Sequence, residues 1–253
     1  MHPHSQTKRT LLRSSLWVAS FLLVCHSVAA EDSYPATPWS KQDSAESSGW
    51  KPEKLKAADE LAASLRSDTY LVVHRGMLVH EYGDIAKPRN IYSMRKSVLS
   101  ILTGMYVERG LIDLELSLAT LDIDDIGGLS PQEKTATVRQ LLQSKSGVYH
   151  DAAYETQEMK ALRPGRGSHP PGSFWYYNNW DFNALGGIFQ QRVGKTVFDS
   201  LRDDLATPLQ FEDFRFPRDT RFVLESASKY PAYVMKLSAR DLARVGLLMT
   251  EAV

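Results

Sequence analysis

One stretch decides the fold: Tyr92-Ser93-Met94-Arg95-Lys96-Ser97-Val98-Leu99-Ser100-Ile101-Leu102-Thr103-Gly104. It predicts a buried helix with a serine at its N-terminus, because a long apolar run follows Ser93. Ser93 and Lys96 lie on one face of such a helix. A lysine in a pocket that disfavours its charge can take the proton of a serine hydroxyl. The helix N-terminus offers a backbone N–H where an oxyanion would form.

The Ser-x-x-Lys spacing is weak evidence by itself. It occurs four times, beginning at Ser5, Ser48, Ser93 and Ser226. Only Ser93 opens a long apolar run. The alternative is that Ser93 merely caps a helix and Lys96 is a solvated residue of its first turn.

The composition sets broad limits on the class of protein. The chain has 253 residues, of which 43% are hydrophobic, enough for a substantial core in one large or two small domains. Thirty basic and thirty acidic residues give zero formal net charge. This balance argues against a nucleic-acid partner bound by bulk charge, and it leaves small-molecule substrates open.

The first thirty residues have the pattern of a secretory signal peptide. Basic residues precede a short apolar run from Leu16 to Cys25, and small residues end at Ala30. We expect cleavage before Glu31 and an exported, periplasmic protein that meets the membrane only during export. An uncleaved anchor is the alternative, although the apolar run is short for a membrane span. Because Cys25 is the only cysteine, the mature chain can form no disulfide or cysteine-based metal site.

The remaining chain alternates turn signals with periodic apolar segments. Residues 31–50 are rich in Ser, Asp, Glu and Pro and predict a flexible lead-in to a domain over 51–253. Helical spacing covers 52–65, and two β-rich runs around Arg75-Gly76 predict a hairpin over 69–83. Helices are expected from Ser93 to Gly110, from a capping box at Thr137 to Gly147, over 180–193 and after Ser238. We therefore expect an α/β (α+β) fold, with a small antiparallel sheet flanked by helices and a helical lobe over about 111–215.

A second motif lies in Pro171-Gly172-Ser173-Phe174-Trp175-Tyr176-Tyr177-Asn178-Asn179, which holds two overlapping Tyr-x-Asn matches. With the Ser93 stretch, this segment resembles the serine β-lactamase and penicillin-binding protein superfamily. It is most similar to the class C-like branch of esterases, D-alanyl-D-alanine peptidases and 6-aminohexanoate-dimer hydrolases. In that branch a Leu-Gly pair follows on the next helix. Aligning Leu185-Gly186 with this pair favours Tyr177 over Tyr176 as the motif tyrosine.

The resemblance implies a role for each motif residue. Ser93 is the nucleophile that becomes acylated, and Lys96 takes or relays its proton. Tyr177 serves as base and then as acid toward the leaving group, and Asn179 orients Lys96 and the substrate. No cofactor and no metal is implied. For Tyr177 the alternative is an aromatic residue that only packs.

One feature of the family is missing from its expected place. Relatives carry a third motif, Lys-Thr-Gly or His-x-Gly, on a later strand that supplies the second oxyanion N–H. This sequence stops at Val253, so we expect an incomplete sheet, an open apolar strand edge and impaired hydrolysis. A non-catalytic binding protein or inactive fragment with a vestigial pocket is the alternative to a serine hydrolase. Neither the substrate nor the oligomeric state is readable.

An acidic segment from Asp122 to Glu133 partly imitates a calcium loop. Ile126 occupies a ligand position and Pro131 interrupts the loop. We therefore interpret this segment as a solvated acidic turn.

Overall fold

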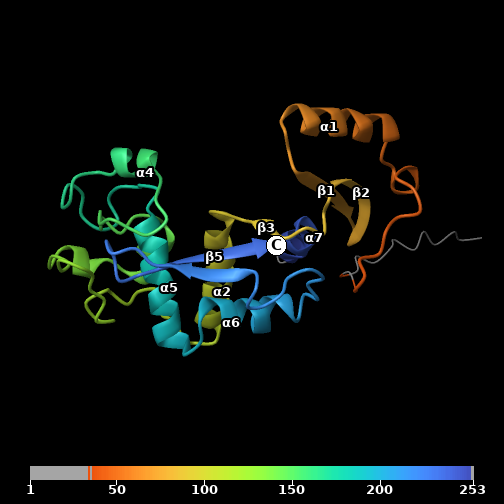
Figure 1. The fold of residues 1–253 in the computed structure, drawn as a ribbon. Helices are drawn as coiled ribbons and strands as arrows, with labels where there is room; N and C mark the ends of the chain where they lie inside the picture. Colours follow the sequence, from red (N-terminus) through yellow and green to blue (C-terminus); the bar gives the residue numbers. More distant parts are fainter. Residues whose placement is uncertain (1–33, 35, 252–253) are drawn as a thin grey trace, which may run out of the picture. The chain divides into compact units, whose positions relative to one another are not determined.

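The computed structural model describes residue 34 and residues 36–251 (Figure 1). Contacts divide the chain into Met1–Glu31 and Asp32–Val253, and all described residues belong to the second unit. The expected signal peptide therefore lies outside the described residues. Among the helices that are described, none is long and apolar enough to cross a membrane.

The hairpin expected over 69–83 is confirmed. Strands β1 (Thr69–His74) and β2 (Met77–Gly83) pair antiparallel, with an irregularity between Val72 and Val73. Arg75 and Gly76 form the turn with φ of 50° and 74°. Two consecutive left-handed residues match the twist of the flanking strands, which explains why a glycine occupies the second position.

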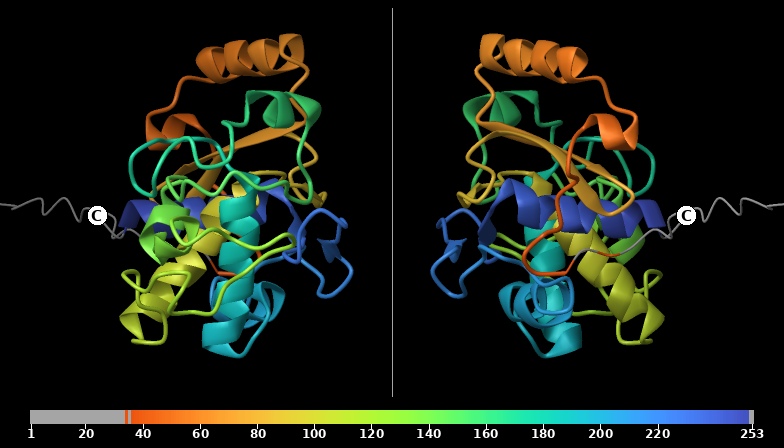
Figure 2. Two further views of the ribbon diagram at one scale, coloured as in Figure 1. Left: turned by 90° about the vertical axis from the view of Figure 1, so that its left-hand side faces the viewer. Right: turned by 90° about the vertical axis from the view of Figure 1, so that its right-hand side faces the viewer.

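Helix α1 (Pro52–Ser64) covers one face of this hairpin in both Figures 1 and 2. The Asp59 carboxylate on α1 accepts a hydrogen bond from the Tyr70 hydroxyl at 2.6 Å and lies 2.8 Å from His80 Nε2. Tyr70 and His80 therefore point to the α1 side. Leu71, one residue along, lines a cavity on the opposite face, as the two-residue period of a strand requires.

The segment expected to be a flexible lead-in instead packs on the hairpin over residues 39–42. Trp39 is only 5% exposed, and its indole N–H donates to the Gly76 carbonyl at 2.7 Å. The Leu78 N–H donates to the Ser40 carbonyl at 2.9 Å. Leu78 is consequently covered, with 4% of its surface exposed. A short 3-10 helix, η1 (Glu46–Ser48), then leads to α1.

A second sheet, which the sequence analysis did not foresee, has the strand order β3-β5-β4. Its strands are β3 (Arg89–Asn90), β4 (Thr220–Val223) and β5 (Ala232–Leu237). The central strand β5 pairs antiparallel with both neighbours. The described residues form no ladder between this sheet and the hairpin.

Helices α2 (Met94–Glu108) and α5 (Asn179–Val193) pack against β5 and carry much of the core. The Gly186-Gly187 pair on α5 permits close approach to two tyrosine rings. A Cβ at Gly186 would lie 3.2 Å from the Tyr233 ring, and one at Gly187 would lie 2.7 Å from the Tyr230 ring. The two glycines therefore allow α5 to pack directly against β5 and against Tyr230, which precedes β5.

Apart from α5, the helices between α2 and β4 are short. They are η2 (Glu133–Thr135), α3 (Val138–Leu142), α4 (Gln157–Leu162), α6 (Val197–Ser200) and the π-helical η3 (Leu201–Ala206). The expected capping box at Thr137 forms, but the helix ends at Leu142 rather than Gly147, because Ser144 turns left-handed with φ 54°. The final helix α7 (Ala239–Glu251) begins as expected, with the Asp241 N–H donating to Ser238 Oγ at 3.1 Å.

The acidic segment around Asp125 is not a solvated turn. Asp125 is buried, and its carboxylate accepts hydrogen bonds at 2.6 Å from both Trp180 Nε1 and Ser228 Oγ. The backbone N–H groups of Ile126 and Lys229 donate to it at 2.7 Å. Asp125 therefore joins its own loop to α5 and to the loop before β5. No cluster of metal-ligating side chains occurs in the described part of the chain.

Candidate active site

Ser93 stands at the N-cap of α2 with its side chain exposed. The preceding residue, Tyr92, has φ 45°, an uncommon conformation for a side chain of this size. The Tyr92 N–H donates to Asn90 Oδ1 at 2.9 Å, so a β3 side chain holds this turn. The next three N–H groups of the helix are already bonded to backbone carbonyls. Among the described residues nothing accepts from the Ser93 N–H, which leaves it available for an oxyanion.

Lys96 is the centre of the site. Its side chain is one helical turn from Ser93, and the residue is 6% exposed. Nζ lies 3.3 Å from Ser93 Oγ, 3.3 Å from the Tyr177 hydroxyl and 2.6 Å from Asn179 Oδ1. Burial, and then the nearby Arg95 cation, lower the pKa of Lys96 from 10.5 to about 7. A substantial fraction of Lys96 is therefore neutral at neutral pH and can accept a proton.

The structure separates the two adjacent tyrosines. The Tyr177 hydroxyl reaches Lys96, and its ring centroid lies 4.7 Å from Nζ. The Tyr176 hydroxyl turns away and donates to the Met159 carbonyl at 2.7 Å. The geometry therefore places Tyr177, the register favoured by the Leu185-Gly186 alignment, beside the serine and lysine.

Asn179 is the first residue of α5 and is buried. Its Oδ1 accepts from Lys96, while its Nδ2 donates to the Tyr154 carbonyl at 2.7 Å. This second bond fixes which amide atom faces Lys96. The neighbouring Asn178 caps α5 by accepting from the Trp180 N–H at 3.1 Å. Asn178 thus caps the helix, whereas Asn179 orients the lysine.

Three residues near the site were missed by the sequence analysis. Asn90 Nδ2 donates to the Tyr154 hydroxyl at 2.8 Å, so Tyr154 contacts both the turn before Ser93 and the anchor of Lys96. Arg95 is 1% exposed, although a charged residue in a first helical turn normally reaches solvent. No local pattern marks these residues, because their partners lie far away in the sequence.

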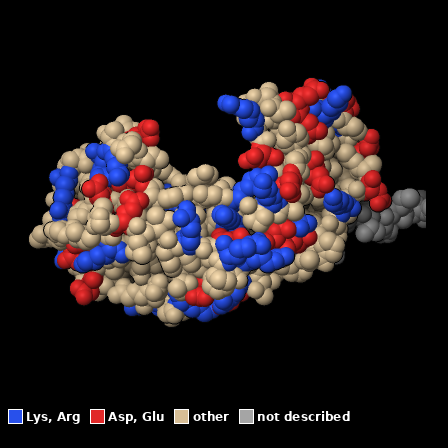
Figure 3. Space-filling view, viewed as in Figure 1, with Lys and Arg blue, Asp and Glu red and all other residues tan. Residues whose placement is uncertain are grey.

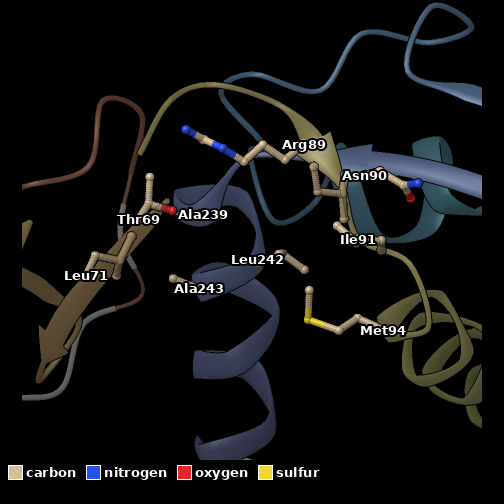
Figure 4. Close-up of a pocket in the computed structure, with 10 residues that line it drawn as sticks. Thr69, Leu71, Arg89, Asn90, Ile91, Met94, Ala239, Leu242 and Ala243 are labelled. Atoms are coloured by element: carbon tan, nitrogen blue, oxygen red, sulfur yellow. The ribbon is translucent and has the colours of Figure 1, made fainter. Parts of the chain in front are cut away.

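A cavity of about 430 Å³ is lined by Asn90, Ile91 and Met94, which are close to Ser93 in the chain. Figure 4 shows the Met94 side chain directed toward Leu242 of α7, with Leu71 of β1 and Ala243 at the opposite wall. Arg89 and Asn90 provide polar atoms at the β3 side. The cavity is therefore largely apolar, and Met94, the residue that follows Ser93, forms part of its wall.

Charges of both signs are interspersed on the face drawn in Figure 3. This distribution agrees with the zero net charge of the chain. Two basic side chains are buried at the site: Lys96, whose pKa is lowered to about 7, and Arg95.

A mixed fold of helices and antiparallel sheets, with serine, lysine and tyrosine side chains converging at the start of a helix, defines a β-lactamase/transpeptidase-like protein. The chain belongs to the Beta-lactamase family, which it matches over residues 58–253. This membership confirms the resemblance found in the sequence.

Solved structures show the same fold. A putative 6-aminohexanoate-dimer hydrolase from Bacillus anthracis is 23% identical, with a TM-score of 0.59 over 75% of this chain and 55% of its own. An octameric penicillin-binding protein homologue from Pyrococcus abyssi is 17% identical, with a TM-score of 0.57 over 76% and 55%. A class C beta-lactamase is 15% identical, with a TM-score of 0.56 over 76% and 63%.

The chain thus spans little more than half the length of the first two of these structures. A search among curated proteins finds no match.

Proposed function

We propose that this protein is a serine hydrolase that cleaves a small ester or amide through an acyl-Ser93 intermediate. The substrate class includes β-lactams, D-alanyl peptides and related carbonyl compounds. Membership of the Beta-lactamase family supports the broad class. The observation that carries the proposal is the position of Lys96 Nζ, within 3.3 Å of both the Ser93 and Tyr177 hydroxyls.

This geometry supports the following first half-reaction. Neutral Lys96 accepts the Ser93 hydroxyl proton while Oγ forms a bond to the substrate carbonyl carbon. The carbonyl oxygen becomes an oxyanion facing the Ser93 N–H at the positive end of α2. When this tetrahedral species collapses, the bond to the leaving group breaks. The Tyr177 hydroxyl, in contact with Lys96, donates the proton that the leaving group takes.

The second half-reaction reverses the proton path. Water loses a proton to the Tyr177–Lys96 pair as its oxygen attacks the acyl carbon. The acyl–Oγ bond then breaks, and Oγ recovers a proton from Lys96. Asn179 keeps the lysine amine aimed at Ser93 throughout, because its other amide atom is bonded to the Tyr154 backbone. The water proton replaces the one given to the leaving group, so Tyr177 ends as a hydroxyl and Lys96 as a neutral amine.

Labelling with a fluorophosphonate tests the proposal. We expect one covalent adduct, located by mass spectrometry on the peptide that contains Ser93. Ser93→Ala should abolish the adduct. Ser97→Ala is a matched control, because Ser97 is exposed on the same helix but is not bonded to Lys96. An adduct that survives Ser93→Ala, or that disappears with Ser97→Ala, would overturn the assignment.

The different-class alternative is a non-catalytic binding protein that retains the pocket. It predicts no adduct on Ser93 and no hydrolysis of nitrocefin or p-nitrophenyl esters, while a β-lactam still binds reversibly. Isothermal titration with the same β-lactam separates this outcome from a serine hydrolase.

A further inference from the structure

Arg95 places a full positive charge inside the protein, immediately before Lys96 in the chain. The residue is 1% exposed, and a guanidinium is not deprotonated in proteins. Its hydrogen bond is a long one, from Nη2 to Asn183 Oδ1 at 3.4 Å. The Tyr233 hydroxyl lies near, yet Nε and Nη1 find no acceptor in hydrogen-bond geometry among the described residues.

Aromatic rings provide the remaining surroundings of this cation. The guanidinium carbon lies 4.6 Å from the centroid of the Tyr233 ring on β5 and 5.9 Å from that of Tyr154. Such contacts stabilise a buried cation only in part. Buried charges in proteins are normally paired, because an unpaired one costs several kcal/mol. A buried cation held by rings and one amide is thus a candidate for a functional role.

The groups facing Lys96 come from three parts of the chain: Ser93 and Arg95 on α2, Tyr177 on the loop before α5, and Asn179 and Phe182 on α5. None of these is a carboxylate. Within the described part of the chain, neither Arg95 nor Lys96 forms an ion pair with an acidic side chain. No acidic side chain among the described residues therefore neutralises the positive charge of Arg95 near Lys96.

We propose that Arg95 is a positioning residue that keeps Lys96 uncharged, so that the amine can act as a base on Ser93 at neutral pH. Lys96 Nζ donates to Asn179 Oδ1 on α5. Arg95 Nη2 donates to Asn183 Oδ1, one turn further along the same face of α5, so the two groups lie close together. A fixed cation disfavours a second positive charge beside it. Burial alone favours the neutral amine, and Arg95 adds to that preference. The inference rests on the function proposed above for Ser93 and Lys96.

The test is the pH dependence of Ser93 labelling by a fluorophosphonate. In the wild-type chain the rate constant should fall below about pH 7, where Lys96 becomes charged. Arg95→Met removes the cation and keeps the site dry, so the pKa of Lys96 should rise. We expect the acid limb to move up by about one pH unit, which lowers the rate about tenfold on that limb and restores it at higher pH.

Arg139→Met is the matched control, because Arg139 is an exposed arginine paired with Glu115 at 2.7 Å. It removes one positive charge without touching the site, and its acid limb should coincide with that of the wild type. Arg95→Gln serves as a second variant if Arg95→Met does not fold. An unchanged limb in a folded Arg95 variant would overturn the inference.

A second measurement does not depend on hydrolysis. Selective ¹³C labelling of lysine side chains, with the Lys96 signal assigned by its loss in Lys96→Arg, gives the lysine titration directly. We expect a midpoint near 7 in the wild type and a higher midpoint in Arg95→Met. Equal midpoints refute the role of Arg95. If Ser93 is never labelled but the midpoints differ as expected, the proposed function fails while the effect of Arg95 on Lys96 stands.

Discussion

Replacing Tyr177 by phenylalanine removes one oxygen atom and tests the proton path most directly. The hydroxyl lies 3.3 Å from Lys96 Nζ, and the residue is 39% exposed. Losing a positioned acid or base costs about 10²- to 10⁴-fold in rate. We therefore expect Tyr177→Phe to slow acylation of Ser93 by a factor in that range. Because this hydroxyl is partly solvated, the free energy of unfolding should change by less than about 0.5 kcal/mol.

The adjacent Tyr176 provides the control with identical chemistry. Its hydroxyl is bonded to the Met159 carbonyl at 2.7 Å, away from the lysine. Tyr176→Phe should leave the acylation rate unchanged and cost about 0.5–1.5 kcal/mol of stability, the usual value of one hydrogen bond. Stopped-flow labelling and urea unfolding measure the two quantities. The reasoning is refuted if Tyr177→Phe labels at the wild-type rate, or if Tyr176→Phe is slowed as much.

Three further predictions concern a buried amine, a buried carboxylate and a strand edge. Because the pKa of Lys96 is near 7 in the folded state and 10.5 otherwise, the unfolded chain binds more protons between these values. Stability should therefore rise with pH from about 7 to 10.5, and Lys96→Met should remove this slope in urea unfolding while abolishing labelling. Asp125→Ala leaves several buried donors unpaired and should cost at least about 3 kcal/mol, whereas exposed Asp43→Ala should stay within about 0.5 kcal/mol by thermal unfolding. Leu71 lies beside an apolar cavity on β1, one edge of which pairs with no strand in the described part of the chain. We expect oligomers on gel filtration and a shift toward monomer with Leu71→Lys, and a monomeric wild type would contradict this.

The sequence predicted those elements whose signals are local. The hairpin turn at Arg75-Gly76 and the capping box at Thr137 need only adjacent residues, and both formed as expected. The second sheet was missed because its central strand, Ala232–Leu237, is buried on both faces and lacks polar alternation. The helix expected to reach Gly147 ends earlier because Ser144 is left-handed. No sequence pattern predicts that conformation at a serine.

The sequence predicted those residues of the candidate site that belong to family motifs. Ser93, Lys96, Tyr177 and Asn179 were expected, and the structure brings all four together. Their catalytic roles remain predictions until labelling is done. The residues that surround them were not foreseen, because burial of a charged side chain such as Arg95 depends on rings supplied by distant parts of the chain.

Among the described residues the hairpin forms no ladder with the sheet that borders the serine helix, and this separation has a dynamic consequence. Backbone amides shared across one continuous sheet open together, whereas two separate sheets can open as independent cooperative units. Amides of β1 and β2 should thus exchange with solvent deuterium through a local opening, well before those of α5 at the centre of the core. Motion of the hairpin can then widen or narrow the cavity beside Met94 while the Ser93–Lys96–Tyr177 geometry persists.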